Sequence, residues 1–162
     1  MARRRLALES LERRLLLAGD VTASVKGGWL VVTGDDLGNQ VQIEDLGGGT
    51  YDVVGLGDTT IIGAGPFASP KGIKVDLKGG DDTLVMSGDP VFGVPGDLSI
   101  KMGDGDDTVL LENAEIAGKT TVDLGKGAGD VTIFAVDFGK DVAVKSGDAP
   151  GVEDPWVEIG IE

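Results

Sequence analysis

Apolar and polar residues alternate one by one along most of the chain after residue 20. This period of two is the pattern of β-strands that bury one face and expose the other. The alternating runs are short and rich in Val, Ile, Leu and Thr, and turns rich in Gly and Asp separate them. The sequence therefore predicts an all-β fold of short strands and tight turns.

Three of the alternating segments align with one another without gaps. They are IKVDLKGGDDTLVM (73–86), LSIKMGDGDDTVLL (98–111) and TTVDLGKGAGDVTI (120–133), and a fourth, VAVKSGDAPG from Val142, matches at its start. The starts lie 25, 22 and 22 residues apart, and each copy is a strand, a Gly/Asp turn and a second strand. This period is too short for a strand–helix–strand unit, whereas it suits one coil of a β-solenoid.

Parallel pairing of successive coils brings equivalent positions of the copies into columns. We therefore expect residues 68–162 to form a parallel β-helix or solenoid of about four coils. The predicted inward columns are Ile73/Leu98/Thr120/Val142, Val75/Ile100/Val122/Val144, Leu77/Met102/Leu124 and Leu84/Val109/Val131.

Before residue 68 the repeat gives way to hairpin signals. SVKGGWLVV predicts a hairpin that turns at Gly27-Gly28, and VQIEDLGGGTYDVV predicts another that turns at 47–49. We expect residues 21–67 to form a small antiparallel β unit that caps the solenoid, because an uncapped end leaves strand edges unpaired. At the other end, Trp156 is predicted to cover the last coil.

The first 20 residues predict a separate, basic amphipathic helix, since Leu8, Leu11 and Leu15 recur at helical spacing. The segment LESLERRLLL (8–17) resembles the LEPR-xLL segment that begins many exported, repeat-rich bacterial surface proteins, with Arg13 where that family has proline. The resemblance implies an export or sorting role for 1–20 and an extracellular or cell-envelope location. The alternative is a plain basic helix that packs on the body.

Composition and charge narrow the classes of function. Cysteine and histidine are absent, which excludes disulfides, Cys/His zinc sites and His-dependent triads. The formal net charge is −14 and all five arginines lie in the first 14 residues, so the acidic body repels nucleic acid and anionic lipid. No apolar run is long enough to predict a transmembrane segment.

The turns of the repeats crowd carboxylates together. A strand spacing of about 4.8 Å between coils places Asp82 over Asp107 and Asp81 over Asp106. Two carboxylates at that distance repel each other by about 1 kcal/mol in water, so their stacking needs a cause. One cause is hydrogen bonding of each aspartate to its own turn. The other is calcium, which prefers carboxylate and carbonyl oxygens as ligands.

The turns also resemble the haemolysin-type (RTX) calcium-binding repeat, G-G-x-G-x-D-x-U-x. GDGDDTV matches it at Gly103, Gly105 and Asp107, and KGGDDTL matches at Gly80 and Asp82. The motif occurs once per 22 to 25 residues here, whereas in that family it recurs every nine. The resemblance implies a calcium site whose predicted ligands are Asp82, Asp107, Asp104, Asp81, Asp106, Gly80, Gly103 and Gly105.

These features favour a non-enzymatic exported or cell-surface β-solenoid with a structural or binding role, stabilised by calcium at its Gly-Asp turns. A surface polymer or a protein is the expected partner, and no catalytic residue is predicted. One alternative is a polysaccharide-active β-helix lyase or hydrolase, since glycoside hydrolysis needs only two carboxylates. The body has no arginine after Arg14 and few aromatics, which weighs against it. The other alternative is a surface module that self-associates end to end through its strand edges.

Overall fold

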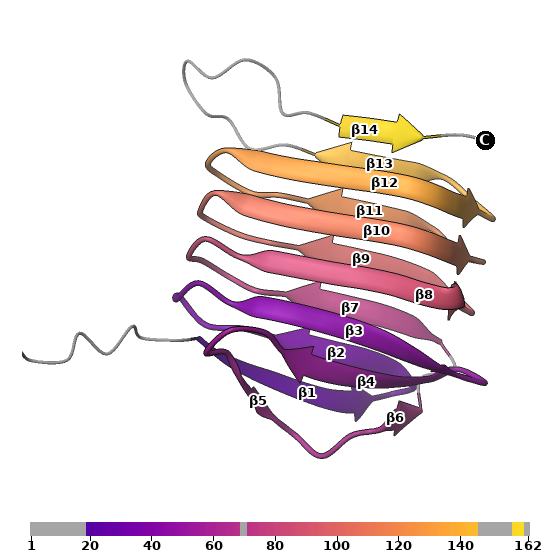
Figure 1. Cartoon of the computed structure of the whole chain (residues 1–162), viewed down its shortest axis with the longest axis horizontal. Coiled ribbons are helices and arrows are strands. Elements are labelled where there is room, and N and C mark those ends of the chain that lie inside the picture. Colours follow the sequence, from indigo (N-terminus) through magenta and orange to yellow (C-terminus); the bar gives the residue numbers. More distant parts are fainter. Residues whose placement is uncertain (1–18, 69–70, 146–156, 161–162) are drawn as a thin grey trace, which may run out of the picture.

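The computed structural model describes residues 19–68, 71–145 and 157–160 (Figure 1). All regular structure in these ranges is β-strand, which confirms the all-β prediction. Residues 1–18 of the helix predicted within 1–20, and Trp156 with its predicted covering role, lie outside these ranges, whereas Asp20 begins a strand. The strands are β1 (Asp20–Lys26), β2 (Trp29–Thr33), β3 (Gln40–Gly47), β4 (Thr50–Gly55), β5 (Thr60–Ile62), β6 (Phe67–Ala68), β7 (Gly72–Asp76), β8 (Thr83–Val94), β9 (Asp97–Lys101), β10 (Asp107–Ile116), β11 (Thr120–Asp123), β12 (Gly129–Phe138), β13 (Val142–Lys145) and β14 (Val157–Gly160).

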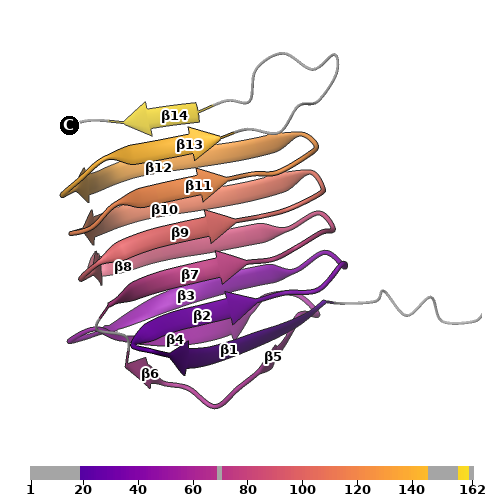
Figure 2. The same cartoon turned by 180° about the vertical axis from the view of Figure 1, so that it is seen from behind.

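The strands form two seven-stranded sheets that lie face to face. Sheet A has the order β13-β11-β9-β7-β2-β1-β5, and sheet B has the order β14-β12-β10-β8-β3-β4-β6. Figure 1 shows sheet B in front, and Figure 2 shows sheet A in front. From β5 onward the chain alternates between the sheets, so that each repeat unit consists of one strand of sheet A, a turn and one strand of sheet B.

Equivalent strands of successive repeat units pair in parallel. In sheet A, Ile73 pairs with Leu98, Leu98 with Thr120 and Thr120 with Val142. In sheet B, Leu84 pairs with Val109, which pairs with Val131. The predicted register is therefore confirmed for these two columns. The strands pair in this register because the gapless repeat puts the same apolar position of each unit on the same face of its sheet.

Both sheets are nevertheless mixed rather than purely parallel. β1 and β2 pair antiparallel around Gly27-Gly28, and β3 and β4 pair antiparallel around 47–49, as the two hairpin signals predicted. β6 adds antiparallel to β4, and β5 adds parallel to β1. The described fold is thus an all-β pair of mixed sheets rather than a purely parallel β-helix. The antiparallel pairs all involve β1–β4 and β6, in the part of the chain where an antiparallel unit was expected.

The hairpin region does not stand apart from the repeats. β2 pairs in parallel with β7, and β3 pairs in parallel with β8, so that Leu30 lies beside Ile73 and Val41 beside Leu84. The segment 29–43 is therefore one more repeat unit. The sequence pattern did not reveal it because Gly34 stands at the position of Leu77 and interrupts the apolar column.

The apolar core fills the space between the two sheets. Leu30, Ile73 and Leu98 of one inward column are at most 1% exposed. At the end of the same column, Val142 is 38% exposed. Burial of this column is thus almost complete through its first members and is lost at β13.

Candidate functional site

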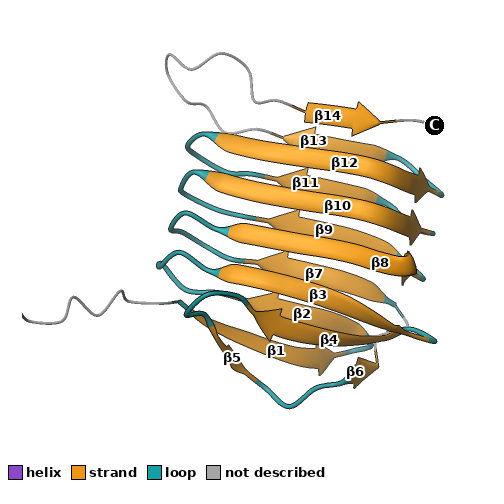
Figure 3. Cartoon of the chain, in the orientation of Figure 1, coloured by secondary structure: helices purple, strands orange, loops and turns teal. Residues whose placement is uncertain are grey.

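The Gly-Asp turns lie along one edge of the molecule, where sheet A strands connect to sheet B strands (Figure 3). Adjacent turns approach each other closely. A Cβ added to Gly103 would lie 1.6 Å from the Lys78 carbonyl oxygen, and one added to Gly105 would lie 2.0 Å from the Gly80 carbonyl oxygen. Both residues also have φ values, +120° and +151°, that favour glycine. These glycines are therefore required for the close stacking of the turns.

Two of the predicted ligands, Asp82 and Asp107, are buried in this edge, at 1% and 2% exposure. The Asn39 backbone N–H donates to Asp82 Oδ1 over 2.7 Å, and Asn39 Nδ2 donates to the same oxygen over 3.1 Å. The Asp82 backbone N–H donates in turn to Asp107 Oδ1 over 3.0 Å. Each carboxylate therefore bonds to the preceding repeat unit. We name Asn39, Asp82 and Asp107 the turn column.

A second set of carboxylates bonds in the opposite direction along the stack. Asp81 Oδ1 accepts the Asp106 backbone N–H over 3.0 Å, and Asp106 Oδ1 accepts the Ala128 backbone N–H over 3.0 Å. Asp81 and Asp106 lie at the surface side of the turns, outside the buried column. These bonds differ from one of the two causes considered from the sequence, bonding of each aspartate to its own turn, because the acceptors reach amides of neighbouring repeat units. The short distance between stacked turns, which the sequence does not display, is the cause.

Three oxygens of the turn column have no hydrogen-bond partner among the described residues. They are Asn39 Oδ1, Asp82 Oδ2 and Asp107 Oδ2, and all three are buried. An unpartnered buried carboxylate oxygen is costly unless a proton or a cation neutralises it. The turn column therefore has acceptor capacity that the protein's own donors do not fill.

The electrostatics of the turn column favour bound protons. Burial, together with the Asp107 charge, raises the pKa of Asp82 to about 7, against the hydrogen bonds from Asn39, which lower it. Burial likewise raises the pKa of Asp107 to about 6, against the hydrogen bond from the Asp82 amide, with the charges of Asp81, Asp106 and Asp104 adding to the rise. A positive charge between the two carboxylates would oppose both shifts.

The other predicted ligands do not join this column. Asp104 is exposed and lies 3.5 Å from Lys126 Nζ in an exposed ion pair. Gly80, Gly103 and Gly105 serve the close approach of the turns, with φ between +100° and +151°. Within the described ranges, no group of three or more acidic, His or Cys side chains is arranged to hold a metal ion. Calcium takes six to eight oxygens, so the turn column offers only part of a coordination shell.

Asn39 was not predicted, although it occupies the same turn position as Asp82. Both lie one residue before a sheet B strand, and the first residues of those strands, Gln40 and Thr83, are paired. Gapless alignment of 29–43 with 72–86 would have found it, because the two turns have equal length. The column ends at the other side with Gly129, which pairs with Asp107 and has no side chain.

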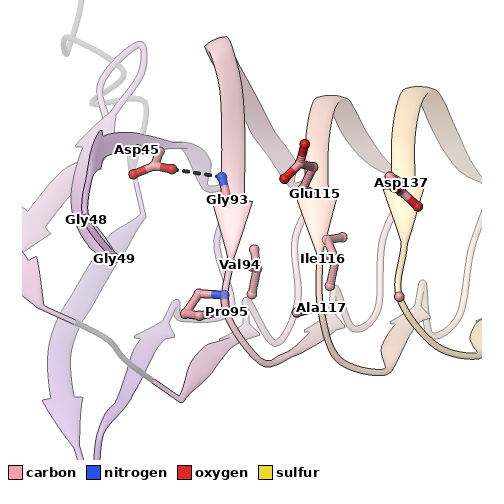
Figure 4. A pocket seen from close by; sticks show the side chains of 11 residues that line it. Asp45, Gly48, Gly49, Gly93, Val94, Pro95, Glu115, Ile116, Ala117 and Asp137 are labelled. Carbon is pink, nitrogen blue, oxygen red and sulfur yellow. Dashed lines mark hydrogen bonds between the residues drawn. The ribbon is translucent and has the colours of Figure 1, made fainter.

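A second candidate site lies at the opposite edge, where sheet B strands return to sheet A. A cavity of about 420 Å³ is lined there by Asp45, Glu115 and Asp137, together with apolar and glycine residues. Figure 4 shows Glu115 and Asp137 on neighbouring strands, β10 and β12, and Asp45 on β3, with β8 and its Gly93 between Asp45 and Glu115. Glu115 pairs in register with Asp137, and Asp45 Oδ2 accepts the Gly93 backbone N–H over 2.8 Å. We name this cavity the acidic groove.

Comparisons with protein-family models, with curated proteins and with solved structures gave no match to this chain. Where the structure describes the chain, it contains no helix long and apolar enough to cross a membrane.

Proposed function

We propose that this chain is a non-enzymatic exported or cell-surface protein, with a β-solenoid body that has a structural or binding role and is stabilised by calcium at the turn column. The observation that carries the calcium part is the pair of buried, stacked carboxylates of Asp82 and Asp107. Each has one oxygen bonded to a neighbouring unit and one oxygen without a partner among the described residues.

The solenoid interpretation rests on the strand pairing. Five successive units, β2–β3, β7–β8, β9–β10, β11–β12 and β13–β14, stack in parallel in both sheets. The antiparallel strands then act as a cap at the β1 end. A stack of this kind presents long, regular outer faces that suit a structural or binding role.

The turn column supplies the chemistry for a cation. A divalent cation bound there would neutralise two stacked carboxylates and link successive repeat units. Asn39 would contribute a third oxygen, and waters or backbone carbonyls would have to supply the rest. Asp81, Asp104 and Asp106 are outside the column and would raise the local cation concentration from the surface.

The test is thermal melting of the full chain with calcium, with magnesium and with a chelator. Calcium at about 100 times its Kd should stabilise the fold by about 2.7 kcal/mol if it binds only the folded chain. Asp107→Asn should abolish the shift, whereas Asp104→Asn, at an exposed turn aspartate, should retain it. A melting temperature that does not respond to calcium would overturn the calcium part and leave protons as the neutralising groups.

The exported location rests on the resemblance of residues 8–17. Its test is fractionation of cells that express the full chain or a chain lacking 1–18. Export of the first and retention of the second support the proposal, and equal distribution contradicts it.

The enzyme alternative would use the acidic groove, whose lining includes no basic or aromatic side chain among the described residues. Release of sugar from a polysaccharide panel, lost in Glu115→Gln, would revive that alternative.

A further inference from the structure

The strand edge of β13 is the starting point for a further inference that does not depend on the proposed calcium site. Among the described residues, β13 pairs only with β11, on one side. Val142, which belongs to an inward column, is 38% exposed there. At the opposite end, the sheets finish in β5 and β6, which are three and two residues long. Short strands of that kind protect an edge from pairing. β13 has four residues and, among the described residues, a partner strand on one side only.

A row of alternating charges runs across the outer face of sheet A toward this edge. Asp76 pairs with Lys101, Lys101 with Asp123 and Asp123 with Lys145. Opposite charges at neighbouring cross-strand positions stabilise a sheet, and like charges destabilise it. The row ends at the edge on Lys145, which has an acidic neighbour on one side only within the described sheet.

A second row alternates in the same way at the other end of these strands. Lys119 donates its backbone N–H to Asp97 Oδ1 over 2.8 Å. Lys119 and Asp141 each immediately precede a strand, and the first residues of those strands, Thr120 and Val142, are paired. The row thus reads Asp97, Lys119, Asp141 and ends on an acid. The two rows therefore end on opposite charges that are four residues apart on one edge.

We propose that a second copy of this chain binds this edge antiparallel, about a two-fold axis that is normal to the sheet and passes midway between Ala143 and the partner's Ala143. This register places Asp141 opposite the partner's Lys145, and Lys145 opposite the partner's Asp141. It also places Val142 opposite the partner's Val144 and covers its exposed side chain. Both charge rows then continue across the interface with unbroken alternation. β14 is the outermost strand of sheet B, and the same axis brings its backbone edge toward the partner's.

The two-fold arrangement is preferred over head-to-tail stacking. Head-to-tail addition would bring β5, whose sequence is Thr60-Ile61-Ile62, against β13. That strand has no charge to meet Asp141 or Lys145. An isologous interface uses the same edge twice and closes, so it gives a discrete dimer rather than a growing polymer. The end-to-end assembly considered from the sequence is thereby replaced by a closed pair.

The experiment is analytical ultracentrifugation of the full chain, of Lys145→Glu, of Asp141→Lys and of an equimolar mixture of these two variants. The wild type should form a dimer of the 16.6 kDa chain at concentrations up to about 1 mM, where weak interfaces associate. Each variant creates two like-charge pairs across the axis and should weaken dimerisation by about tenfold or more. The mixture should restore it, because each pair of positions 141 and 145 across the heterodimer axis then joins one acidic and one basic side chain.

Lys26→Glu is the matched control, since it makes the same charge change on β1 at the far end of sheet A. It should dimerise as the wild type does. Circular dichroism of each variant checks that the chain remains folded. A wild type that stays monomeric throughout the range, or that forms open-ended polymers, overturns the proposal. So does a mixture that dimerises no better than the separate variants.

Discussion

The two edges of the molecule hold carboxylate side chains in opposite ways. At the turn edge, Asp82 and Asp107 point inward, lie at most 2% exposed and accept amide hydrogen bonds from the neighbouring unit. At the other edge, Glu115 and Asp137 stand side by side on paired strands and remain exposed in the acidic groove. Stacked carboxylates are therefore accommodated in two ways: by backbone hydrogen-bond donors at the turn edge, and by exposure to water at the groove edge. Stability should depend on the first edge far more than on the second.

The largest contrast is expected for glycines. Gly103→Ala should destabilise the fold by more than about 3 kcal/mol, because its Cβ would overlap the Lys78 carbonyl and its φ is +120°. Gly48→Ala, in the hairpin beside the acidic groove, has no atom within 4 Å of the new Cβ and a φ of +66°, so about 1 kcal/mol is expected. Urea unfolding of both variants measures the difference. Equal losses would show that the turns can separate without cost.

The next contrast compares one carboxylate from each edge. Asp82→Ala removes the acceptor of the buried Asn39 N–H and should cost about 2–4 kcal/mol. Asp137→Ala, in the acidic groove, should change stability by no more than about 0.5 kcal/mol. The free energy of unfolding in denaturant is the measurement. An Asp82→Ala protein as stable as the wild type would mean that relief of the buried carboxylate outweighs the lost hydrogen bonds.

The dependence of stability on pH should also differ between the two edges. The folded pKa values of Asp82 and Asp107 are about 7 and about 6, above the ordinary 3.8 of an unfolded chain. Between these limits the folded state binds more protons than the unfolded state, so their contribution falls as pH rises from about 4 to about 7. Without calcium, the wild type should lose stability relative to Asp82→Asn over this range. A constant difference in melting temperature between the two proteins across that range would contradict the prediction.

The smallest effect is expected within the acidic groove. Glu115→Gln removes a like charge next to Asp137 and should stabilise the fold by about 0.2–0.5 kcal/mol. Because both side chains are exposed, added salt should screen the repulsion and reduce the gain. Thermal melting at low and high salt measures it. A large or salt-independent change would indicate that the groove carboxylates have partners beyond water.

Much of the fold was predictable because the repeat is gapless over each strand–turn–strand segment. The inward columns through Ile73 and Leu84 followed from a period of two within strands and a constant offset between copies. The first two copies of the repeat start 25 residues apart, whereas the later copies start 22 apart. The difference has a local cause, since the register between β10 and β8 shifts between Glu112 and Ala114, opposite the extra residues of β8. These extra residues lie within β8, just before Gly93 and Val94, which line the acidic groove. The repeat pattern carried no signal of that groove because its walls come from residues outside the aligned segments.

The direction of the aspartate hydrogen bonds could not be predicted from sequence. The motif shows that Asp82 and Asp107 stack, but the choice of partner depends on how closely two turns approach. That approach depends on backbone contacts around Gly103 and Gly105. Asn39 was missed for a simpler reason, since glycine at position 34 obscured the unit to which it belongs.

The turn column also has a definite stoichiometry. It is bounded by the neutral amide of Asn39 at one end and by Gly129, which has no side chain, at the other. Only two acids lie between, so under the proposed calcium binding the column would exchange at most two protons for one divalent ion. Under the proposed calcium binding, uptake of the metal would release protons, and its affinity would rise with pH until both acids are ionised. Calorimetry in buffers of different ionisation enthalpy would count those protons directly.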